Sequence, residues 1–147
     1  MPTKIKVSQV MQANPLTVGL KTSLYEAAKF MNEESVGTVL VSNGHKKLLG
    51  LVTDRQIIVR AIAYERNLST TTVEDIMLKW PMTISPETTC KEALDIMGDY
   101  GYRRLPVEKD GILVGIISIG DLSTVIKFDD EHVKGMIKEL SSDVRCK

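Results

Sequence analysis

Apolar and polar positions along the chain follow one pattern twice. Two stretches, SLYEAAKFMNEE (residues 23–34) and TCKEALDIMGDY (residues 89–100), place apolar side chains at the three- and four-residue spacing of a helix. These positions are Leu24, Ala27, Ala28 and Met31 in the first stretch and Cys90, Ala93, Leu94 and Met97 in the second. Ser23 and Glu26 form a capping-box pattern at the start of the first. Each stretch therefore predicts a helix with one apolar face.

Strand patterns surround both predicted helices. A short segment after a proline, PLTV or PMTI, precedes each helix, and two apolar runs follow it, TVLVS and LLGLVT or RLPVE and ILVGIIS. Asn43-Gly44 and Asp110-Gly111 predict the turns that join the runs of each pair. A last helical pattern, DRQIIVRAIAYER or IGDLSTVIKF, closes each half. The expected order is strand, helix, strand, strand, helix, twice.

The two halves are copies of one unit. Shifting the sequence by 66 places aligns Val10–Val41 with Ile76–Val107 and gives eight identities in 32 positions. After a one-residue shortening of the second turn, Gly50 aligns with Gly115. A unit of about 60 residues buries little surface alone, so the two halves are expected to share a core about a pseudo-twofold axis. The predicted fold class is α+β (of α/β type), with two βαββα units packed through their sheets.

Charge and hydropathy limit the classes of partner. The 19 basic and 19 acidic side chains cancel, so no bulk field attracts the protein to nucleic acid, although a local basic patch stays open. The first residues, MPTKIKVSQVM, lack the apolar run of a signal peptide, and no segment approaches the roughly 20 apolar residues of a membrane span. We expect a cytoplasmic protein that associates with neither membranes nor, as its main function, nucleic acid.

Metal and catalytic chemistry find little support. Cys90 and Cys146 lie far apart, so Cys90 is interpreted as a small buried apolar residue, while a disulfide stays open. His45 and His132 have no neighbouring ligands in the sequence, so no metal site is expected. No paired nucleophile and base or phosphate loop of the P-loop type is visible, so no catalytic residue is assigned and an enzyme is not expected.

The duplicated pattern resembles a stand-alone pair of cystathionine-β-synthase (CBS) domains, also called a Bateman module. The resemblance rests on VSQVM and VEDIM, on PLTV and PMTI, on YRRLPV, and on the endings GLVTDRQI and GIISIGDL. It gives a first domain at 7–66, a second at 73–127 and a C-terminal helix or tail at 128–147, which is either a packing lid or a dimer contact. The resemblance implies two clefts between the units, a homodimer, and a regulatory or energy-sensing role exerted on a protein partner.

The resemblance also implies the ligand and its site. CBS pairs bind adenosine-containing ligands, with AMP, ADP or ATP expected here before S-adenosylmethionine or NAD. In the family, the aspartate of the glycine–apolar–apolar–Thr/Ser–x–x–Asp ending accepts hydrogen bonds from the ribose hydroxyls, and Asp121 holds that position. Ser118, Arg103 and Arg104 are the phosphate candidates. Ile84, Pro106 and Ile117 are the candidates for the base, and Thr83 for the rim.

The first copy departs from this pattern. Gln56 replaces the aspartate, and Gly37 and Thr38 replace the two arginines. The sequence therefore predicts one competent site at Asp121 and a second, weaker site formed by Thr53, Arg55, Gln56, Thr17 and Val18.

Simpler interpretations stay open for the same residues. Ser118 with Asp121, and Thr53 with Gln56, are also ordinary helix caps. Arg103 and Arg104 are also a plausible solvated pair, and Trp80 either shields a cleft edge or packs at a dimer seam. The alternative function is a scaffold or interaction protein that keeps the fold without a ligand.

Overall fold

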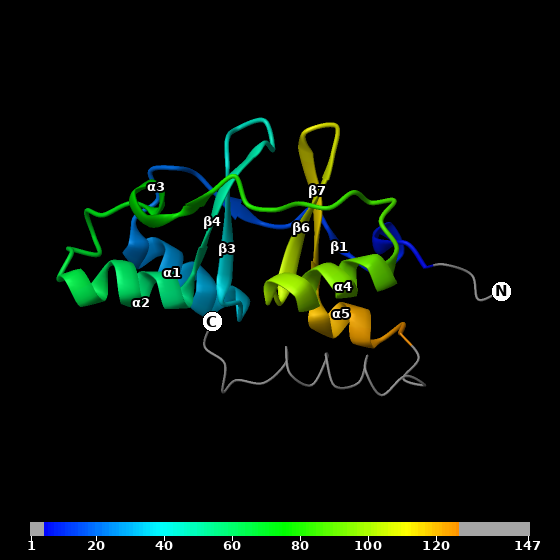
Figure 1. Cartoon of the computed structure of the whole chain (residues 1–147). Coiled ribbons are helices and arrows are strands. Elements are labelled where there is room, and N and C mark those ends of the chain that lie inside the picture. Colours follow the sequence, from blue (N-terminus) through cyan, green and yellow to red (C-terminus); the bar gives the residue numbers. More distant parts are fainter. Residues whose placement is uncertain (1–4, 127–147) are drawn as a thin grey trace. The chain divides into compact units, whose positions relative to one another are not determined.

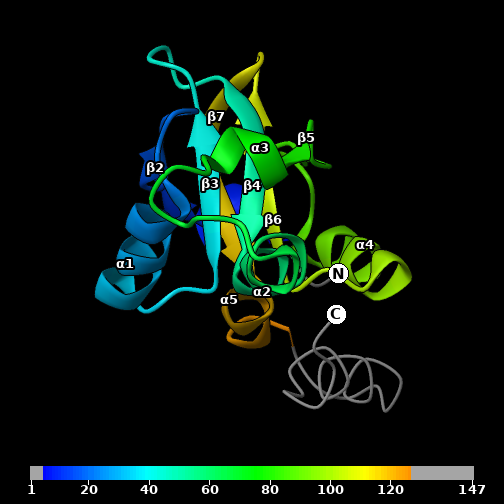
Figure 2. The same ribbon diagram turned by 90° about the vertical axis from the view of Figure 1, so that its left-hand side faces the viewer.

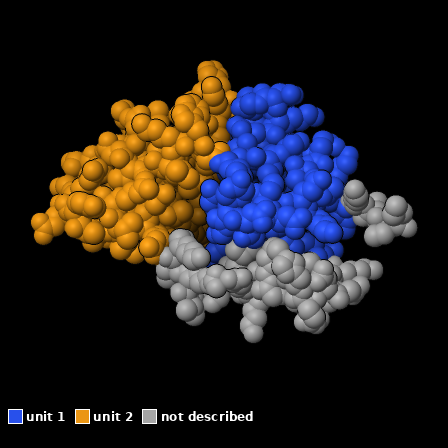
Figure 3. Space-filling view, in the orientation of Figure 1, with its two compact units in different colours: residues 1–15, 82–147 blue, residues 16–81 orange. Residues whose placement is uncertain are grey.

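The computed structural model describes residues 5–126 and divides into two compact units (Figures 1 and 3). Unit 2 is the continuous stretch Leu16–Pro81, and unit 1 takes the chain up to Pro15 and from Met82 onward. The predicted C-terminal helix or tail at 128–147 lies outside the described residues. No helix within residues 5–126 is long and apolar enough to cross a membrane.

Unit 2 contains a four-stranded sheet in the order β2-β3-β4-β5. Its elements are β2 (Thr17–Val18), α1 (Leu24–Glu34), β3 (Thr38–Ser42), β4 (Leu48–Thr53), α2 (Asp54–Arg60), the 3-10 turn η2 (Ile62–Tyr64), α3 (Val73–Ile76) and β5 (Leu78–Lys79). Helix α1 contacts both β3 and α2, and α3 packs on β4 (Figure 2). The core of this unit therefore lies between the sheet and its helices.

Unit 1 contains a three-stranded sheet in the order β1-β7-β6. Its elements are the 3-10 turn η1 (Val7–Gln9), β1 (Gln12–Ala13), α4 (Cys90–Tyr100), β6 (Arg104–Lys109), β7 (Ile112–Ser118) and α5 (Ile119–Ser123). The PMTI segment forms a single parallel bridge, Ile84 to Val107, in place of a named strand. The predicted mixture of helices and two sheets is confirmed, as is the predicted succession of helix, strand, strand and helix in each half.

The compact units do not coincide with the sequence repeats. The segment before the first repeat body, with η1 and β1, pairs with β7 of unit 1, whereas α3 and β5 from between the repeats join unit 2. Each unit therefore combines the body of one repeat with the leading segment of the other. We refer to this arrangement as the segment exchange.

Two aligned glycines make room for the exchanged segments. A Cβ added at Gly50 would lie 2.6 Å from the Met77 sulfur and 2.8 Å from the Leu78 carbonyl oxygen. A Cβ at Gly115 would collide with the Met11 sulfur in the same way. Neither glycine has a positive φ, so backbone conformation does not require glycine at these positions. Glycine is required because a methionine of the exchanged segment approaches the backbone closely.

The two amphipathic helices begin where their apolar patterns predict, but they bury different apolar stripes. Helix α1 is capped by the Ser23 side chain, and α4 by Thr89. All four predicted stripe positions of α4 are buried. In α1, Ala28 is exposed, although its repeat partner Leu94 is only 1% exposed. Cys90 is buried as predicted, and burial raises the pKa of its thiol.

The two hairpin turns differ in length. Asp110 and Gly111 have φ values of 52° and 77°, as the predicted two-residue turn requires. The other hairpin needs a longer connection from Asn43 to Lys47, whose left-handed residue is Lys46 with φ 60°. The Asn43 side chain accepts hydrogen bonds from two backbone N–H groups of this loop.

Candidate functional site

The candidate site in unit 1 is the junction between β7 and α5. Ser118 ends the strand, and its Oγ accepts a hydrogen bond from the Asp121 backbone N–H at 3.1 Å. The Asp121 Oδ2 atom in turn accepts from the Ser118 N–H at 2.9 Å. This reciprocal capping box satisfies two backbone donors and orients the carboxylate at the start of the helix. The capping interpretation is therefore confirmed for this pair.

Unit 2 has the same cap at the junction of β4 and α2. The Gln56 Oε1 atom accepts from the Thr53 N–H at 3.0 Å, and the Thr53 Oγ1 atom accepts from the Gln56 N–H at 3.1 Å. The two caps differ in the group that remains. The cap hydrogen bond uses one carboxylate oxygen of Asp121 and leaves the other as an acceptor. The same bond uses the side-chain carbonyl oxygen of Gln56 and leaves its NH2 group as a donor. Equivalent caps thus present opposite hydrogen-bonding groups to a ligand.

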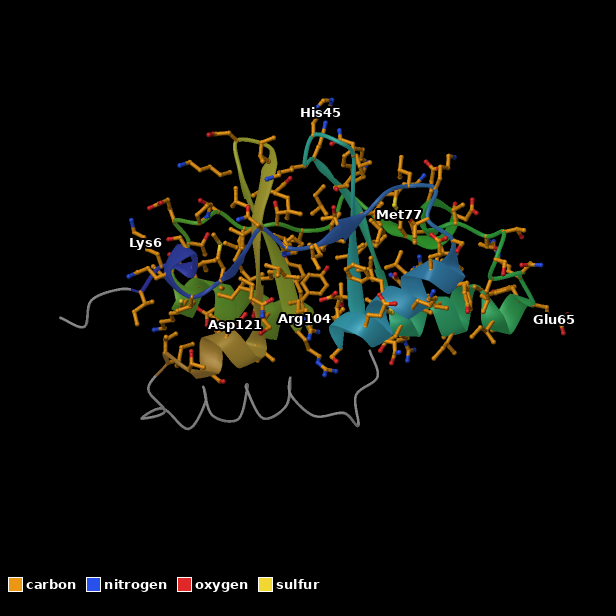
Figure 4. The ribbon with its side chains drawn as sticks, turned by 180° about the vertical axis from the view of Figure 1, so that it is seen from behind. Lys6, His45, Glu65, Met77, Arg104 and Asp121 are labelled. Atoms are coloured by element: carbon orange, nitrogen blue, oxygen red, sulfur yellow. The ribbon has the colours of Figure 1, made fainter. Side chains whose placement is uncertain are left out.

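The arginine pair lies beside the unit 1 junction, as predicted. Arg104 is the register partner of Ser118 across the β6–β7 pair, and the Arg103 carbonyl oxygen accepts from the Ile119 N–H at 2.9 Å. Figure 4 shows Arg104 and Asp121 at the same end of unit 1. A guanidinium and a carboxylate on adjacent elements suit a ligand that carries both an anion and hydroxyl groups.

The equivalent place in unit 2 carries an acid instead. Thr38 pairs with Thr53, and the Gly37 carbonyl oxygen accepts from the Asp54 N–H at 3.0 Å. The Asp54 carboxylate lies over Gly37, since a Cβ added there would be 2.9 Å from Asp54 Oδ2. Asp54 is exposed, whereas its counterpart Ile119 is buried. This carboxylate disfavours an anionic ligand next to the Thr53–Gln56 cap, even with Arg55 adjacent in sequence.

Strand alternation determines which apolar residues share a face with Ser118. Along β7, Ile117 is fully buried in the unit 1 core, whereas Ile116 and Ser118 are half-buried on the other face. Across the pair, Pro106 is opposite Ile116, just as Arg104 is opposite Ser118, and directly opposed residues share a face.

The face that bears Ser118 therefore consists of Arg104, Pro106, Ile116 and Ser118. Ile117 does not belong to it. Ile116 is not among the residues predicted for the base, although the two-residue period of a strand identifies it.

The PMTI segment lies along the other edge of β6. The Ile84 N–H donates to the Pro106 carbonyl oxygen at 3.0 Å, and the Ile84 carbonyl oxygen accepts from the Glu108 N–H at 2.9 Å. These bonds bring the half-buried Thr83 next to the strand that carries Arg104 and Pro106. The Ile84 side chain itself belongs to the core of unit 1.

The corresponding segment of unit 2 already uses its polar group. The Thr17 hydroxyl and the Ser42 hydroxyl share a hydrogen bond of 2.6 Å. Val18 packs against the core of unit 2. The residues predicted for the second site thus include one hydroxyl that is engaged within the protein and one side chain that supports the core.

Comparisons with known proteins agree with the duplicated architecture. The model of the CBS domain matches residues 7–62 and 73–128. The uncharacterized protein YlbB of Bacillus subtilis is 33% identical over 119 residues, which cover 80% of each chain. The CBS domain-containing protein CBSCBSPB1 of Arabidopsis thaliana is 34% identical over 113 residues, 77% of this chain but only 21% of that longer protein.

A solved structure connects the fold with a nucleotide. The crystal structure of CBSX2 in complex with AMP matches with a TM-score of 0.72 and 25% identity, covering 82% of this chain and 94% of that one. Two family matches in tandem, on a chain whose halves repeat the same elements, determine the classification. The chain is a CBS-domain pair and belongs to the CBS domain family.

Proposed function

We propose that the chain is a regulatory module that binds an adenosine-containing ligand at the β7–α5 junction of unit 1. The observation that carries the proposal is the Asp121 carboxylate, which the cap orients while using only one of its two oxygens. The remaining oxygen can accept hydrogen bonds from a ribose diol, and charge-assisted bonds of this kind are stronger than neutral ones.

Neighbouring groups on the same face support the other parts of such a ligand. Arg104 lies opposite Ser118 in the sheet and offers a guanidinium to phosphate. Ile116, which is half-buried one residue pair further along the strands, supplies an apolar side chain, while Pro106 opposite it is buried. The crystal structure of the similar protein CBSX2 in complex with AMP supports an adenosine nucleotide as the ligand. AMP, ADP and ATP are the preferred candidates, ahead of S-adenosylmethionine and NAD.

The regulated state is proposed to be a homodimer that acts on a protein partner. Helix α2 and turn η2 expose apolar side chains to a degree unusual for a surface, namely Ile58 at 56%, Ile62 at 52% and Tyr64 at 75%. A second copy of the chain would cover them. Sedimentation should give a dimer, and Ile58→Glu with Ile62→Glu should give a monomer; a monomeric parent protein would contradict this part of the proposal.

The test of the ligand site compares two variants that damage equivalent caps. Asp121→Ala and Gln56→Ala each remove the side-chain acceptor of one N-cap N–H, so their effects on folding are matched. Calorimetric titration with AMP, ADP and ATP should show no binding to Asp121→Ala and nearly unchanged binding to Gln56→Ala. Equal losses from both variants would contradict a single competent site.

A third variant separates the charge from the cap. Asp121→Asn keeps an oxygen for the Ser118 N–H but removes the negative charge, so affinity should fall about 10- to 150-fold while stability changes little. In parallel, a nucleotide at 100 times its dissociation constant should add about 2.7 kcal/mol to the free energy of unfolding of the parent protein.

The second candidate function is a ligand-free scaffold. It is favoured by the complete caps at both junctions, which account for Asp121 and Gln56 by folding alone. Unchanged melting curves with all five adenosine compounds would establish this function in place of the first.

A further inference from the structure

One end of unit 2 carries a basic and aromatic surface that the nucleotide site does not use. The surface, called the basic tip below, consists of Lys46 and Lys47 from the β3–β4 loop, Lys79 from β5, and Trp80 directly after it. All four residues are exposed, and Trp80 is 66% exposed. Figure 4 marks the loop by its neighbour His45, at the far end of the hairpin from the Thr53 junction.

The structure brings these residues together around the indole ring. The Trp80 backbone N–H donates to the Leu49 carbonyl oxygen at 3.1 Å, which holds the residue beside the hairpin loop. The Lys47 Nζ atom lies 5.7 Å from the centre of the ring, within the range of a cation–π contact. Within residues 5–126, no ion pair joins Lys46, Lys47 or Lys79 to a carboxylate. The basic tip therefore combines uncompensated positive charge with an exposed aromatic face.

The corresponding end of unit 1 shows that folding does not require these side chains. Ala13 pairs with Gly115 as Lys79 pairs with Gly50, and the Asn14 N–H donates to Val114 as that of Trp80 donates to Leu49. Unit 1 thus builds the same backbone with alanine and asparagine.

Trp80 is also an unfavourable choice for its backbone conformation. Both Asn14 and Trp80 have a left-handed backbone, with φ values of 52° and 51°. Asparagine tolerates this conformation, whereas a bulky side chain there is an outlier. An exposed tryptophan that strains its backbone and buries little surface contributes little to stability, which makes a role in binding the better explanation.

We propose that the basic tip binds single-stranded nucleic acid, with a base stacked on the Trp80 indole and phosphates held by the three lysines. Stacking on an aromatic side chain combined with basic residues along the backbone is the general means of binding single strands. The zero net charge of the chain does not oppose this, because the charge that matters is local. Because only three lysines contribute, binding of the strand should be weak and should weaken further as the salt concentration rises.

Two other anionic partners fit the surface less well. The loop from Asn43 to Lys47 has no apolar side chain, so it would add nothing to Trp80 on insertion into a lipid surface. The side chains of an acidic peptide, Asp and Glu, would satisfy the lysines but supply no ring to stack on the exposed indole. A nucleic acid strand supplies a phosphate and a ring face with every nucleotide.

The chain offers a specific probe, because Trp80 is its only tryptophan. A twelve-residue oligothymidylate or oligouridylate, titrated at low salt, should quench the intrinsic fluorescence as a base stacks on the ring. With three lysines engaged, the logarithm of the binding constant should fall with the logarithm of salt concentration with a slope of about −2. Comparison of the two oligomers distinguishes a DNA from an RNA ligand. Neither contains adenine, and Asp121→Ala should leave their binding unchanged, which separates this site from the proposed nucleotide site.

Variants copied from unit 1 test the individual contacts. Trp80→Asn removes the ring and relieves the left-handed strain, so it should fold well while binding labelled oligothymidylate about 5- to 150-fold more weakly. Lys79→Ala should reduce the salt slope by about 0.7. Lys109→Ala, in the hairpin of unit 1, is the matched control and should change neither quantity.

Several results would overturn the proposal. These are the absence of binding at low salt, full affinity in Trp80→Asn, and equal affinity for oligothymidylate and for polyglutamate. Binding to phosphatidylserine vesicles with a blue shift of Trp80 emission, without binding to either oligomer, would assign the tip to a lipid surface instead.

Discussion

The junctions of β7 with α5 and of β4 with α2 have the same backbone and different chemistry. Both end a strand at a hydroxyl residue, and both close a reciprocal cap with the residue three positions on. Unit 1 adds Arg104 and a spare carboxylate oxygen, whereas unit 2 adds Thr38 and an amide donor. The comparison shows that folding requires the cap in both units. The polar atom that the cap does not use differs between the units and is available for function.

At the loop ends of the two hairpins, away from the junctions, unit 2 and not unit 1 carries the unusual residues. The basic tip belongs to unit 2, while unit 1 has alanine and asparagine at the positions of Lys79 and Trp80. Each unit thus has unusual residues at one end of its hairpin, and the two units have them at different ends, although Lys79 and Trp80 belong to the second sequence copy. Duplication lets two ligand surfaces diverge on one fold without competing for the same residues.

The largest expected difference between the units concerns the buried stripes of α4 and α1. Leu94→Ala should lower the free energy of unfolding by about 2–5 kcal/mol, because it leaves a cavity in a fully packed core. The reverse change at the repeat-related position, Ala28→Leu, should alter it by less than about 0.5 kcal/mol, since Ala28 is exposed. Urea denaturation measures both, and a similar cost at the two positions would contradict the difference in packing.

An intermediate effect is expected at the two glycines that accommodate the segment exchange. Gly50→Ala meets a backbone carbonyl at 2.8 Å, whereas the nearest backbone atom at Gly115 is 3.1 Å away and the closer Met11 sulfur can rotate. Overpacking should therefore cost about 2–3 kcal/mol at Gly50 and about 1–2 kcal/mol at Gly115.

Thermal and urea unfolding of the two alanine variants would rank them. Two double variants provide the control, namely Gly50→Ala with Met77→Ala and Gly115→Ala with Met11→Ala. Shortening the methionine should recover more stability at Gly115 than at Gly50. A larger loss at Gly115 would show that the methionine, and not the backbone, limits the space.

The smallest effect is the pH dependence of the cap at the start of α3 in unit 2. The Thr72 N–H and hydroxyl donate to Asp75 Oδ2 at 2.9 and 3.1 Å, and the backbone bond, followed by the hydroxyl bond, lowers the pKa of Asp75 below its usual 3.8. A lowered pKa stabilises the fold above the pKa of the unfolded chain, and this contribution is lost as pH falls through the folded pKa. In unit 1 the equivalent cap uses Gln9, which does not titrate.

Asp75→Asn should therefore flatten the loss of stability in acid, and Gln9→Asn should leave the acid profile unchanged. The measurement is the urea midpoint as a function of pH below neutrality. An identical profile for the parent protein and Asp75→Asn would show that the cap contributes no pH dependence.

Local pattern was sufficient to predict α1, α4, the two hairpins and the junction residues, whereas α3 was not predicted and α2 and α5 are shorter than predicted. The apolar spacing gave the extent of α1 and α4, and the spacing of Ser118 and Asp121 indicated the capping box that the structure contains. The family resemblance led us to expect Arg103 and Arg104 near the ligand, and the register of β6 and β7 places Arg104 opposite Ser118.

Features that depend on register or on distant segments were not predictable. Asp54 is one residue from a predicted cap, yet its position over Gly37 becomes visible only when β3 and β4 are paired. Nothing in a repeat shows which glycine, its own or the other copy's, Met11 or Met77 will contact. Trp80 had two interpretations, and its exposure with Lys47 over the ring supports a third.

The segment exchange also constrains the order in which the protein can fold during synthesis. Unit 2 is continuous in sequence, so all of it has been made before the strands of unit 1 that receive β1. Residues 5–15 must therefore wait, unpaired, while the ribosome adds more than 90 residues up to β7. The first part of unit 1 is thus synthesised before unit 2 and the second part after it, so unit 1 is the last of the two units to be completed.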